Sequence, residues 1–224
     1  MRVTELWRYP VRSVGGEPLM TADVGSSGVP FDRIFDVFDE RDERTWAGSV
    51  PGLMRVTAVM VDDAVAELVL PDGARVRTDA ADVDLRLSAA VDGKVRLVPH
   101  RPDNIDKALH IVTRTSLQTL GDALPDSVVD SSRFRPNLVL DDVPGGGYPE
   151  HGWIGRRLAI GSLRLRFTGG CDRCVLITKQ TPTVPHDRSI LRWVARELGN
   201  TLGVYASVES AGTVEVGSMP EWLD

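Results

Sequence analysis

The sequence predicts a mainly β protein in which the strands form two β-barrel-like units. Many short runs alternate apolar and polar residues or are rich in β-branched residues. Glycine, proline and aspartate separate these runs at turn-like spacings, and few stretches have the periodicity of a helix. We expect an N-terminal barrel over residues 1–98 and a second barrel with about two helices over residues 99–224.

The first unit is predicted to consist of strands joined by tight turns. Pro10 ends the first strand because it has no backbone donor, and the P-D-G segment at 71–73 favours a hairpin turn. The run at 34–39 is apolar at most positions and is expected to be buried. The expected strands are residues 1–9, 34–39, Val56–Val61, Ala64–Leu70, Arg75–Thr78 and Val95–Val98.

The second unit follows a polar connection over residues 99–109. Leu117, Leu120 and Leu124 have helical spacing, with Thr115 or Ser116 as the expected N-cap and Pro125 as the end. A hydroxyl-capped helix start is also an anion site. Residues Ser189–Leu198 are predicted to form an amphipathic helix. The expected strands are His110–Thr113, Arg133–Asp141, Ile154–Gly161, Leu163–Phe167, Val175–Thr178, Val204–Val208 and Thr213–Val216.

Composition excludes several classes of protein. The 224 residues are 42% hydrophobic and 26% charged, which is typical of a soluble globular protein. The formal net charge of -6 argues against nucleic-acid binding. The sequence has no apolar stretch long enough to cross a membrane and no apolar signal core near its start, so we expect a cytoplasmic protein without a membrane partner. Its two cysteines are then expected to be free thiols.

Both cysteines lie in the segment G-G-C-D-R-C-V-L-I-T, from Gly169 to Thr178. Four interpretations stay open: buried packing, a redox C-x-x-C pair, a zinc site, or one thiolate that binds a soft metal. The expected strand after Cys174 weakens the redox pair, which usually opens a helix. No histidines at paired spacing support zinc. Arg173 beside Cys174 favours the thiolate.

Basic, amide or hydroxyl side chains recur at the expected ends of strands and helices. Arginine and hydroxyl groups of this kind donate hydrogen bonds to phosphorylated organic ligands. Pro136 fixes the backbone between Arg135 and Asn137, which aims both side chains. The candidate ligand-binding residues are Arg12, Ser13, Arg33, Thr115, Ser116, Arg135, Asn137 and Arg173.

Several of these segments resemble, in order, those of MOSC-domain proteins, named for the molybdenum cofactor sulfurase C-terminal domain. The chain is most similar to the branch with an N-terminal MOSC-associated β-barrel, which includes the mitochondrial amidoxime-reducing component and bacterial relatives. The resemblance covers nearly the whole chain. The matching segments are Y-P-V-R-S, F-D-R-I-F-D-V-F-D, T-R-T-S-L-Q-T-L, R-F-R-P-N-L-V-L-D, C-D-R-C-V-L-I-T, L-G-V-Y and G-T-V-E-V-G.

The resemblance implies a molybdenum cofactor of the molybdopterin type. It implies that Cys174 is the catalytic residue and the protein ligand to molybdenum, and that Cys171 is a neighbour. It places Arg12 and Ser13 at the pterin phosphate region. The other cofactor-binding residues that it implies are Arg33, Thr115, Ser116, Arg135, Asn137, Asp172, Arg173 and Tyr205. At the level of the whole family it also implies pyridoxal phosphate binding.

The implied activity is the reduction of N-hydroxylated compounds, of the amidoxime, hydroxylamine or N-oxide type. The sequence has no cysteine cluster for an iron–sulfur centre, so electrons are expected from a separate reductase or an iron–sulfur or flavin protein. A monomer is expected. One alternative is a carrier of the cofactor or of sulfur on Cys174, without turnover. Another is a structural relict with a dry core around both thiols.

The chain departs from the family pattern at two places. Arg12 stands where the family usually has lysine, which keeps the charge but changes the geometry. The segment Thr178–Val184 reads T-K-Q-T-P-T-V, where relatives often have T-x-D-x-x-T-G. We therefore expect the protein to differ from its relatives near the substrate opening.

Overall fold

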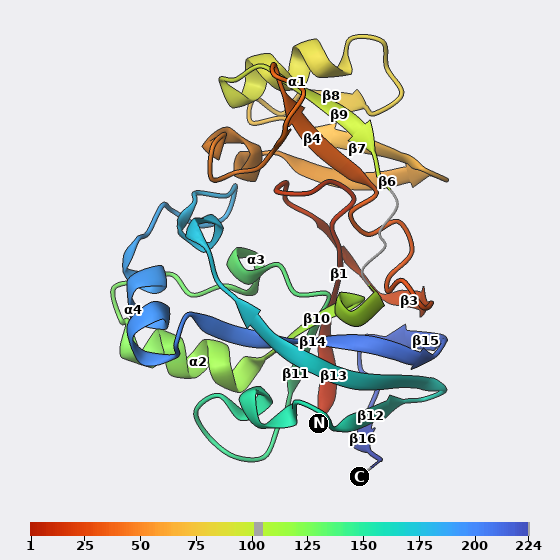
Figure 1. Cartoon of the computed structure of the whole chain (residues 1–224), viewed down its shortest axis with the longest axis vertical. Helices are drawn as coiled ribbons and strands as arrows, with labels where there is room; N and C mark the ends of the chain where they lie inside the picture. The colour runs from red at the N-terminus through yellow and green to blue at the C-terminus, as the bar shows by residue number, and fades with distance from the viewer. Residues whose placement is uncertain (101–104, 224) are drawn as a thin grey trace.

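The computed structural model describes residues 1–100 and 105–223, and it confirms the mainly β class (Figure 1). The largest sheet has eight strands in the order β16-β12-β13-β14-β10-β11-β1-β2. Its strands are β1 (Arg2–Arg8), β2 (Glu17–Leu19), β10 (Leu109–Thr113), β11 (Leu138–Asp141), β12 (Arg157–Ile160), β13 (Leu163–Asp172), β14 (Thr201–Ser210) and β16 (Pro220–Trp222). A second pair joins β3 (Thr21–Val24) to β15 (Gly212–Glu215).

Short helices flank this sheet and enclose an apolar cluster. They are α2 (Arg114–Ala123), α3 (Ser131–Phe134), α4 (Ser189–Glu197) and the 3-10 helices η2 (Ile105–Lys107), η3 (Pro149–Trp153) and η4 (Val175–Thr178). Leu120, Ile190 and Val194 pack in this cluster against Val112 and Leu202 of the sheet. The amphipathic helix predicted at Ser189–Leu198 is confirmed as α4.

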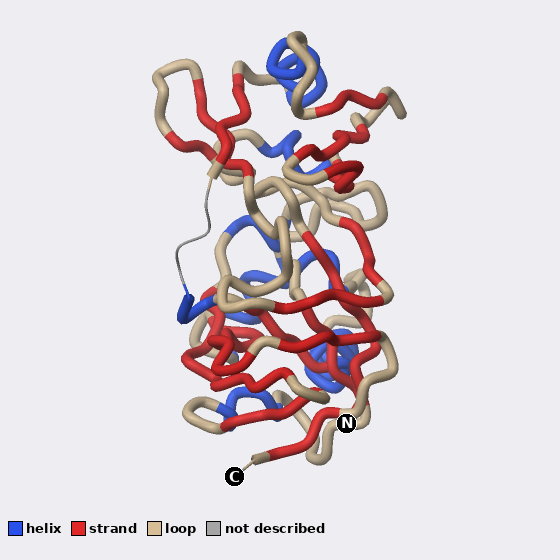
Figure 2. The backbone as a smooth tube through the Cα atoms, turned by 90° about the vertical axis from the view of Figure 1, so that its right-hand side faces the viewer, coloured by secondary structure: helices blue, strands red, loops and turns tan. Residues whose placement is uncertain are grey.

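A smaller unit, the N-terminal unit, lies at the upper end of the view in Figure 1. One sheet has the order β5 (Arg44–Thr45), β4 (Phe35–Asp39), β9 (Val95–Pro99), and the other has the order β6 (Thr57–Asp62), β7 (Val65–Val69), β8 (Arg75–Arg77). The helices α1 (Val83–Val91) and η1 (Pro51–Arg55) complete it. Its strands stand above the large sheet in the turned view of Figure 2. It has its own core, with Leu53, Leu68 and Leu87 fully buried.

The first three strands lie with the large sheet and its neighbouring strand pair, whereas the loop between β1 and β2 packs Val11 and Val14 into the core of the N-terminal unit. β1 lies between β11 and β2, and β3 pairs with β15 near the C-terminus. Figure 1 accordingly shows both chain ends at the lower end of the molecule. The predicted boundary between residues 98 and 99 stays a prediction. Of the expected connection at 99–109, residues 101–104 lie outside the described residues.

The strand predicted at Val175–Thr178 is wrong, because the segment forms the 3-10 helix η4. Ile177 and Thr178 are buried side by side, whereas a strand would turn them to opposite faces. The Thr178 hydroxyl donates to the carbonyl oxygen of Val175 at 2.8 Å, which closes the turn. The β-branched run therefore predicted the burial of Ile177 and Thr178 correctly but predicted a strand where a 3-10 helix forms.

Three other features differ from the prediction. The N-terminal unit is predicted to consist of strands, yet Val83–Val91 forms helix α1. Its buried side chains follow helical spacing, and Leu85 is 73% exposed. The predicted strand at Arg133–Asp141 begins with α3, and only Leu138–Asp141 forms β11. The N-cap of α2 is Thr113, whose hydroxyl accepts from the Ser116 backbone, rather than Thr115 or Ser116.

Candidate functional site

A cavity of about 300 Å³ lies between the loops after β1, the start of β10, the C-terminal end of α3 and the C-x-x-C segment. It collects residues that are far apart in the sequence. Eight of the predicted site residues line it: Arg12, Arg33, Arg135, Asn137, Asp172, Arg173, Cys174 and Tyr205. Ser13, Thr115 and Ser116 do not contribute to its lining.

The two thiols have different surroundings. Cys171 lies in β13, is buried, and donates to the Tyr205 hydroxyl at 3.0 Å. Burial and the neighbouring Cys171 raise the pKa of Tyr205, so its phenol stays protonated at neutral pH. Cys174 is exposed at the edge of the cavity, where it precedes η4. The structure therefore separates an accessible thiol from a packed one.

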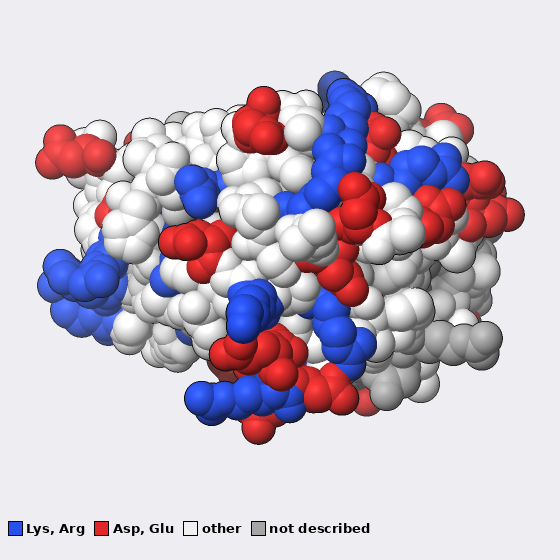
Figure 3. Space-filling model, turned by 90° about the horizontal axis from the view of Figure 1, so that it is seen from above, with Lys and Arg blue, Asp and Glu red and all other residues white. Residues whose placement is uncertain are grey.

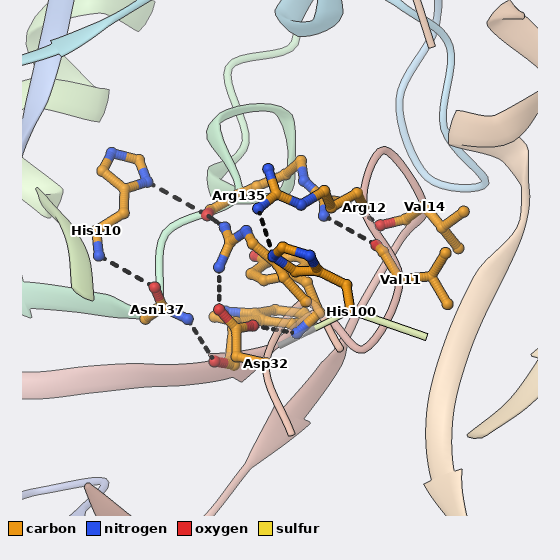
Figure 4. Close-up of polar contacts among 11 residues, drawn as sticks. Val11, Arg12, Val14, Asp32, His100, His110, Arg135 and Asn137 are labelled. Carbon is orange, nitrogen blue, oxygen red and sulfur yellow. Dashed lines mark hydrogen bonds and ion pairs between the residues drawn. The ribbon is translucent and has the colours of Figure 1, made fainter. Parts of the chain in front are cut away.

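The loop that follows β1 is held by Arg135 (Figure 4). The guanidinium of Arg135 donates to the carbonyl oxygens of Val14 and Val11, and its carbon lies 4.3 Å from the centre of the Tyr9 ring. Burial, together with the nearby Arg33, lowers the pKa of Arg135 to about 10, so the group remains charged at neutral pH. Arg135 thus fixes the Y-P-V-R-S segment at the cavity.

Arg33 occupies the other side of this arrangement. Its guanidinium pairs with Asp32, donates to the Arg135 carbonyl oxygen at 3.3 Å and lies 5.3 Å from the centre of the Tyr9 ring. Asp32 also accepts from the Tyr9 backbone at 2.7 Å. Since the Arg33 side chain retains 27% exposure, it can still present hydrogen-bond donors to the cavity.

Arg12 reaches the cavity from the loop and is oriented by the N-terminal unit. Its Nε lies 2.7 Å from a carboxylate oxygen of buried Asp36. Its Nη2 lies 3.2 Å from His100 Nε2, a contact that Figure 4 shows. The Arg12 side chain is 38% exposed. The guanidinium thus reaches two partners through two different nitrogens, which the single nitrogen of a lysine in the same position would not reproduce.

Arg173 donates hydrogen bonds to acceptors within the protein itself. Its Nε donates to the Leu202 carbonyl oxygen at 2.7 Å, its Nη1 to the Phe134 carbonyl oxygen at 3.1 Å, and its Nη2 to His110 Nε2 at 2.6 Å. It is only 7% exposed. Arg173 therefore joins β14, α3 and β10 behind the cavity and contributes charge more than free donors.

His110 lies behind the cavity wall as a neutral ring. Burial and the adjacent Arg173 lower the pKa of His110 well below its ordinary value. Since Nε2 accepts from Arg173, Nδ1 carries the proton and donates to the Arg135 carbonyl oxygen at 3.2 Å. Asn137 completes the wall, because its Oδ1 accepts from the His110 backbone at 3.0 Å.

Thr115 and Ser116 belong to a different environment. Ser116 is fully buried, and with Thr113 it donates to the carboxylate of buried Glu150. This cluster caps the start of α2 and leaves no hydroxyl facing the cavity. Ser13 is buried with a φ of 59° in the loop that Arg135 holds.

Sequence reasoning missed Asp32, Lys107 and His110 as lining residues. Asp32 stands directly before Arg33, so the adjacent acidic and basic residues could have indicated from the sequence that Asp32 pairs with Arg33 at the site. His110 was noticed only as a member of a strand, and nothing local marked its contact with Arg173. The Lys107 nitrogen lies 4.9 Å from the centre of the Tyr205 ring, a contact between residues almost a hundred positions apart that no local pattern announces.

The cavity is strongly basic although the chain carries a net charge of -6. Five cationic side chains line it, namely Arg12, Arg33, Lys107, Arg135 and Arg173, against the two carboxylates of Asp32 and Asp172. Asp172 is exposed and accepts from Thr201 at 3.2 Å. This composition, with an accessible thiol at the edge, suits an anionic ligand that also presents a soft metal.

The other interpretations of the cysteines can now be compared with the geometry. Within residues 1–100 and 105–223, no three His, Cys, Asp or Glu side chains gather as a metal site. The strand that weakened the redox pair is absent, but η4 has only four residues. The expectation of a dry core around both thiols is wrong for Cys174, because that residue is exposed. None of the helices that the structure describes is long and apolar enough to cross a membrane.

The chain is similar to several known proteins. Mitochondrial amidoxime-reducing component 1 of Mus musculus is 25% identical, over 96% of this chain and 80% of the mouse protein. Mitochondrial amidoxime reducing component 2 of Homo sapiens is 24% identical, over 96% of this chain and 81% of the human protein. The crystal structure of the YuaD protein from Bacillus subtilis shares the fold, with a TM-score of 0.55 and 14% identity over 98% of this chain and 93% of that one.

Two family profiles together cover residues 1–219. The profile of the MOSC N-terminal beta barrel domain matches residues 1–109, and the profile of the MOSC domain matches residues 84–219. The second match alone spans more than half of the chain and includes both cysteines and most of the residues that line the cavity. By this match, the chain belongs to the MOSC-domain family.

Proposed function

We propose that the cavity binds a molybdenum cofactor of the molybdopterin type, with the Cys174 sulfur as the protein ligand to molybdenum. One observation carries the proposal: the exposed thiol stands at the edge of a cavity in which five cations face two carboxylates, although the chain as a whole is acidic. A thiolate suits a soft metal, and arginine and lysine suit a phosphate. Family membership supports the same cofactor class.

The lining residues divide into two groups in this proposal. Arg12, Arg33 and Lys107 keep exposed donors and would contact the anionic part of the cofactor. Arg135 and Arg173 are buried and bonded to backbone carbonyls, so they position the loops and supply positive potential. When bound, the cofactor supplies two-electron transfer of an oxygen atom.

We infer that the reaction is the reduction of N-hydroxylated compounds. The N–O bond breaks, two electrons come from a separate reduced iron–sulfur or flavin protein, and two protons are taken up, which gives an N–H product and water. Tyr205 and Lys107 hold protons at the cavity, the first as a phenol whose pKa is raised by burial. The two mammalian relatives, which are named for amidoxime reduction, support this substrate class.

The test compares the two cysteines as matched variants. The protein is produced in cells supplied with molybdate, and bound molybdenum and released pterin are measured for wild type, Cys174→Ser and Cys171→Ser. We expect Cys174→Ser to lose metal by roughly tenfold or more, and Cys171→Ser to retain it because that thiol faces Tyr205. Equal metal content in both variants, or none in wild type from replete cells, would contradict the proposal.

A carrier role is the second candidate, and the exposure of Cys174 favours it as well. A carrier would hold the cofactor or a persulfide on Cys174 without turnover. Reduced viologen dye with benzamidoxime separates the two roles. Benzamidine formation identifies a reductase, whereas retained cofactor or sulfane sulfur without product identifies a carrier.

A further inference from the structure

A second basic surface lies on the far side of η4 from the cavity. It consists of two adjoining depressions of about 290 and 420 Å³, which share Lys179 and His186. Arg55 lines the first, and Arg188 and Arg192 line the second. No aspartate or glutamate lines either depression. We refer to Arg55, Lys179, His186, Arg188 and Arg192 as the basic depression.

The cations of this surface have no counter-charges. Within the part of the chain that the structure describes, Arg55, Lys179, Arg188 and Arg192 make no ion pair and no side-chain hydrogen bond. On the face of the N-terminal unit seen in Figure 3, many basic and acidic side chains lie next to one another instead. The pairs there include Arg75 with Glu67, Arg77 with Asp79, and Arg96 with Asp42.

The nearest acidic side chain does not neutralise the surface. Asp187 lies between His186 and Arg188, but its carboxylate accepts from the Ser189 backbone at 2.8 Å and also from the Ser189 hydroxyl. It is half-buried and lines neither depression. The four cations without an ion pair in the described part of the chain outnumber this one carboxylate, and the surface therefore has a local positive potential that attracts an anionic partner although the chain has a net charge of -6.

The position of the basic depression relative to Cys174 suggests the function of an anionic protein that would bind there. Helix η4 begins directly after Cys174 and separates the two hollows. Its residues Leu176 and Ile177 line the cavity, whereas Val175 and Thr178 line the basic depression. A partner docked on the basic depression would lie one short helix away from the proposed metal ligand. Electron transfer through protein falls steeply with distance, so this proximity favours a redox partner.

We propose that the basic depression is the docking surface for an electron-donor protein with an acidic face. This inference rests on the proposed reductase function. Electrostatic complementarity raises the association rate of such encounters without requiring a large apolar interface. The acidic chain as a whole disfavours a nucleic-acid partner, and Lys179 lies in the segment that departs from the family pattern. The surface would thus select a donor specific to this protein.

The binding experiment uses the whole chain, with or without cofactor. A purified acidic [2Fe–2S] ferredoxin is titrated into the ¹⁵N-labelled protein at low ionic strength, and amide shifts are recorded. We expect shifts concentrated at residues 179–192, and roughly tenfold weaker binding for the double variant Arg188→Glu/Arg192→Glu. High salt should remove the difference, because exposed charges are screened.

A matched charge reversal serves as control. Arg41→Glu alters an exposed arginine of the N-terminal unit that makes no side-chain ion pair within the described residues. It should bind the ferredoxin as wild type does. The milder variant Arg188→Gln/Arg192→Gln should lie between wild type and the double reversal, which guards against a folding defect. Equal weakening by Arg41→Glu, or shifts confined to another face, would overturn the docking surface.

A kinetic comparison separates this inference from the proposed function. The loaded enzyme is assayed with reduced ferredoxin and, in parallel, with reduced viologen dye. We expect the double reversal to lower the ratio of the ferredoxin-driven rate to the dye-driven rate by roughly tenfold. If the enzyme is active with the dye but the double reversal leaves the ratio of the ferredoxin-driven rate to the dye-driven rate unchanged, the docking proposal fails and the reductase function stands. Absence of activity with either reductant sinks the reductase function, while the shift mapping still reports on the surface.

Inorganic phosphate is the last arm of the test. If millimolar phosphate displaces the ferredoxin and binds at residues 179–192 with a saturable isotherm, the depression is a small-anion site and the docking proposal fails. If phosphate acts only through ionic strength, as chloride does at equal strength, the protein partner is supported.

Discussion

At the residue scale, the arginines of the site have different roles. Arg12 and Arg33 keep exposed hydrogen-bond donors at the cavity. Arg135 and Arg173, in contrast, donate to backbone carbonyl oxygens. In the sequence all four are simply basic residues near loop or strand ends. Burial decides the difference, because a buried guanidinium must find acceptors in the protein. His110 is the acceptor that Arg173 finds alongside these carbonyls.

The neutral state of His110 gives a prediction on pH. Since its folded pKa lies well below 6.5, the unfolded chain takes up a proton first as the pH falls, and the folded state loses relative stability. Between pH 7.5 and pH 5.5 this residue should cost about 1.4 kcal/mol of unfolding free energy. Urea unfolding of wild type and His110→Gln at both pH values measures it, and a pH slope unchanged by the substitution would contradict it.

At the element scale, β10 and β14 set the position of the cavity wall. His110 pairs with Tyr205 across these antiparallel strands, and the two rings lie 5.6 Å apart. Gly203 makes this approach feasible. It has a φ of +77°, and an added Cβ would lie 2.7 Å from His110 Nε2 and 2.8 Å from the Ile111 carbonyl oxygen. A glycine in the middle of a strand here marks close contact.

Gly203→Ala should therefore destabilise the protein by roughly 2–4 kcal/mol, through positive-φ strain and overpacking against His110. Gly146→Ala is the matched control, because its φ is not positive and an added Cβ meets nothing within 4 Å. We expect that control to stay within about 0.5 kcal/mol of wild type. Equal unfolding free energies for the two variants, measured in denaturant, would refute this account of Gly203.

At the scale of the whole molecule, the N-terminal segment ties the two units together. β1 pairs with β11 in the large sheet. The loop after it packs Val11 and Val14 into the core of the N-terminal unit, and the chain then returns to the large sheet as β2. Val3 and Leu6 are buried in the core of the large sheet. Arg135, at the end of α3, clamps the same loop from the other side. Cavity geometry therefore depends on the path of the first 24 residues.

A fragment comprising residues 99–224 should consequently fail to fold cooperatively. It would leave β11 with an unpaired edge and would lose two buried side chains worth roughly 1.5–3 kcal/mol each. Adding residues 1–24 through a flexible linker should restore a cooperative thermal transition. Circular dichroism melts of both fragments provide the measurement. A sharp transition in the shorter fragment would show that the second unit is independent of β1.

The sequence determined much of the fold. Alternation and turn residues located the hairpins that the structure contains as β6–β7 and β12–β13, and amphipathic spacing located α4. Local pattern failed in Val175–Thr178, where an apolar β-branched run forms a 3-10 helix, and in Val83–Val91, where a helix forms in a unit predicted to consist of strands. Those residues respond to tertiary packing, which overrides weak local preference.

The candidate site divides in the same way. Residue type and motif were enough to nominate Cys174, Arg12, Arg33, Arg135 and Tyr205, all of which line one cavity. Only the tertiary structure decided that Cys174 is exposed while Cys171 is buried. It also decided that the Ser116 hydroxyl donates to Glu150 and does not face the cavity. Lys107 and His110 line the cavity for the same reason. Burial, hydrogen-bond partners and charge balance arise from contacts between residues distant in sequence, so no local pattern encodes them.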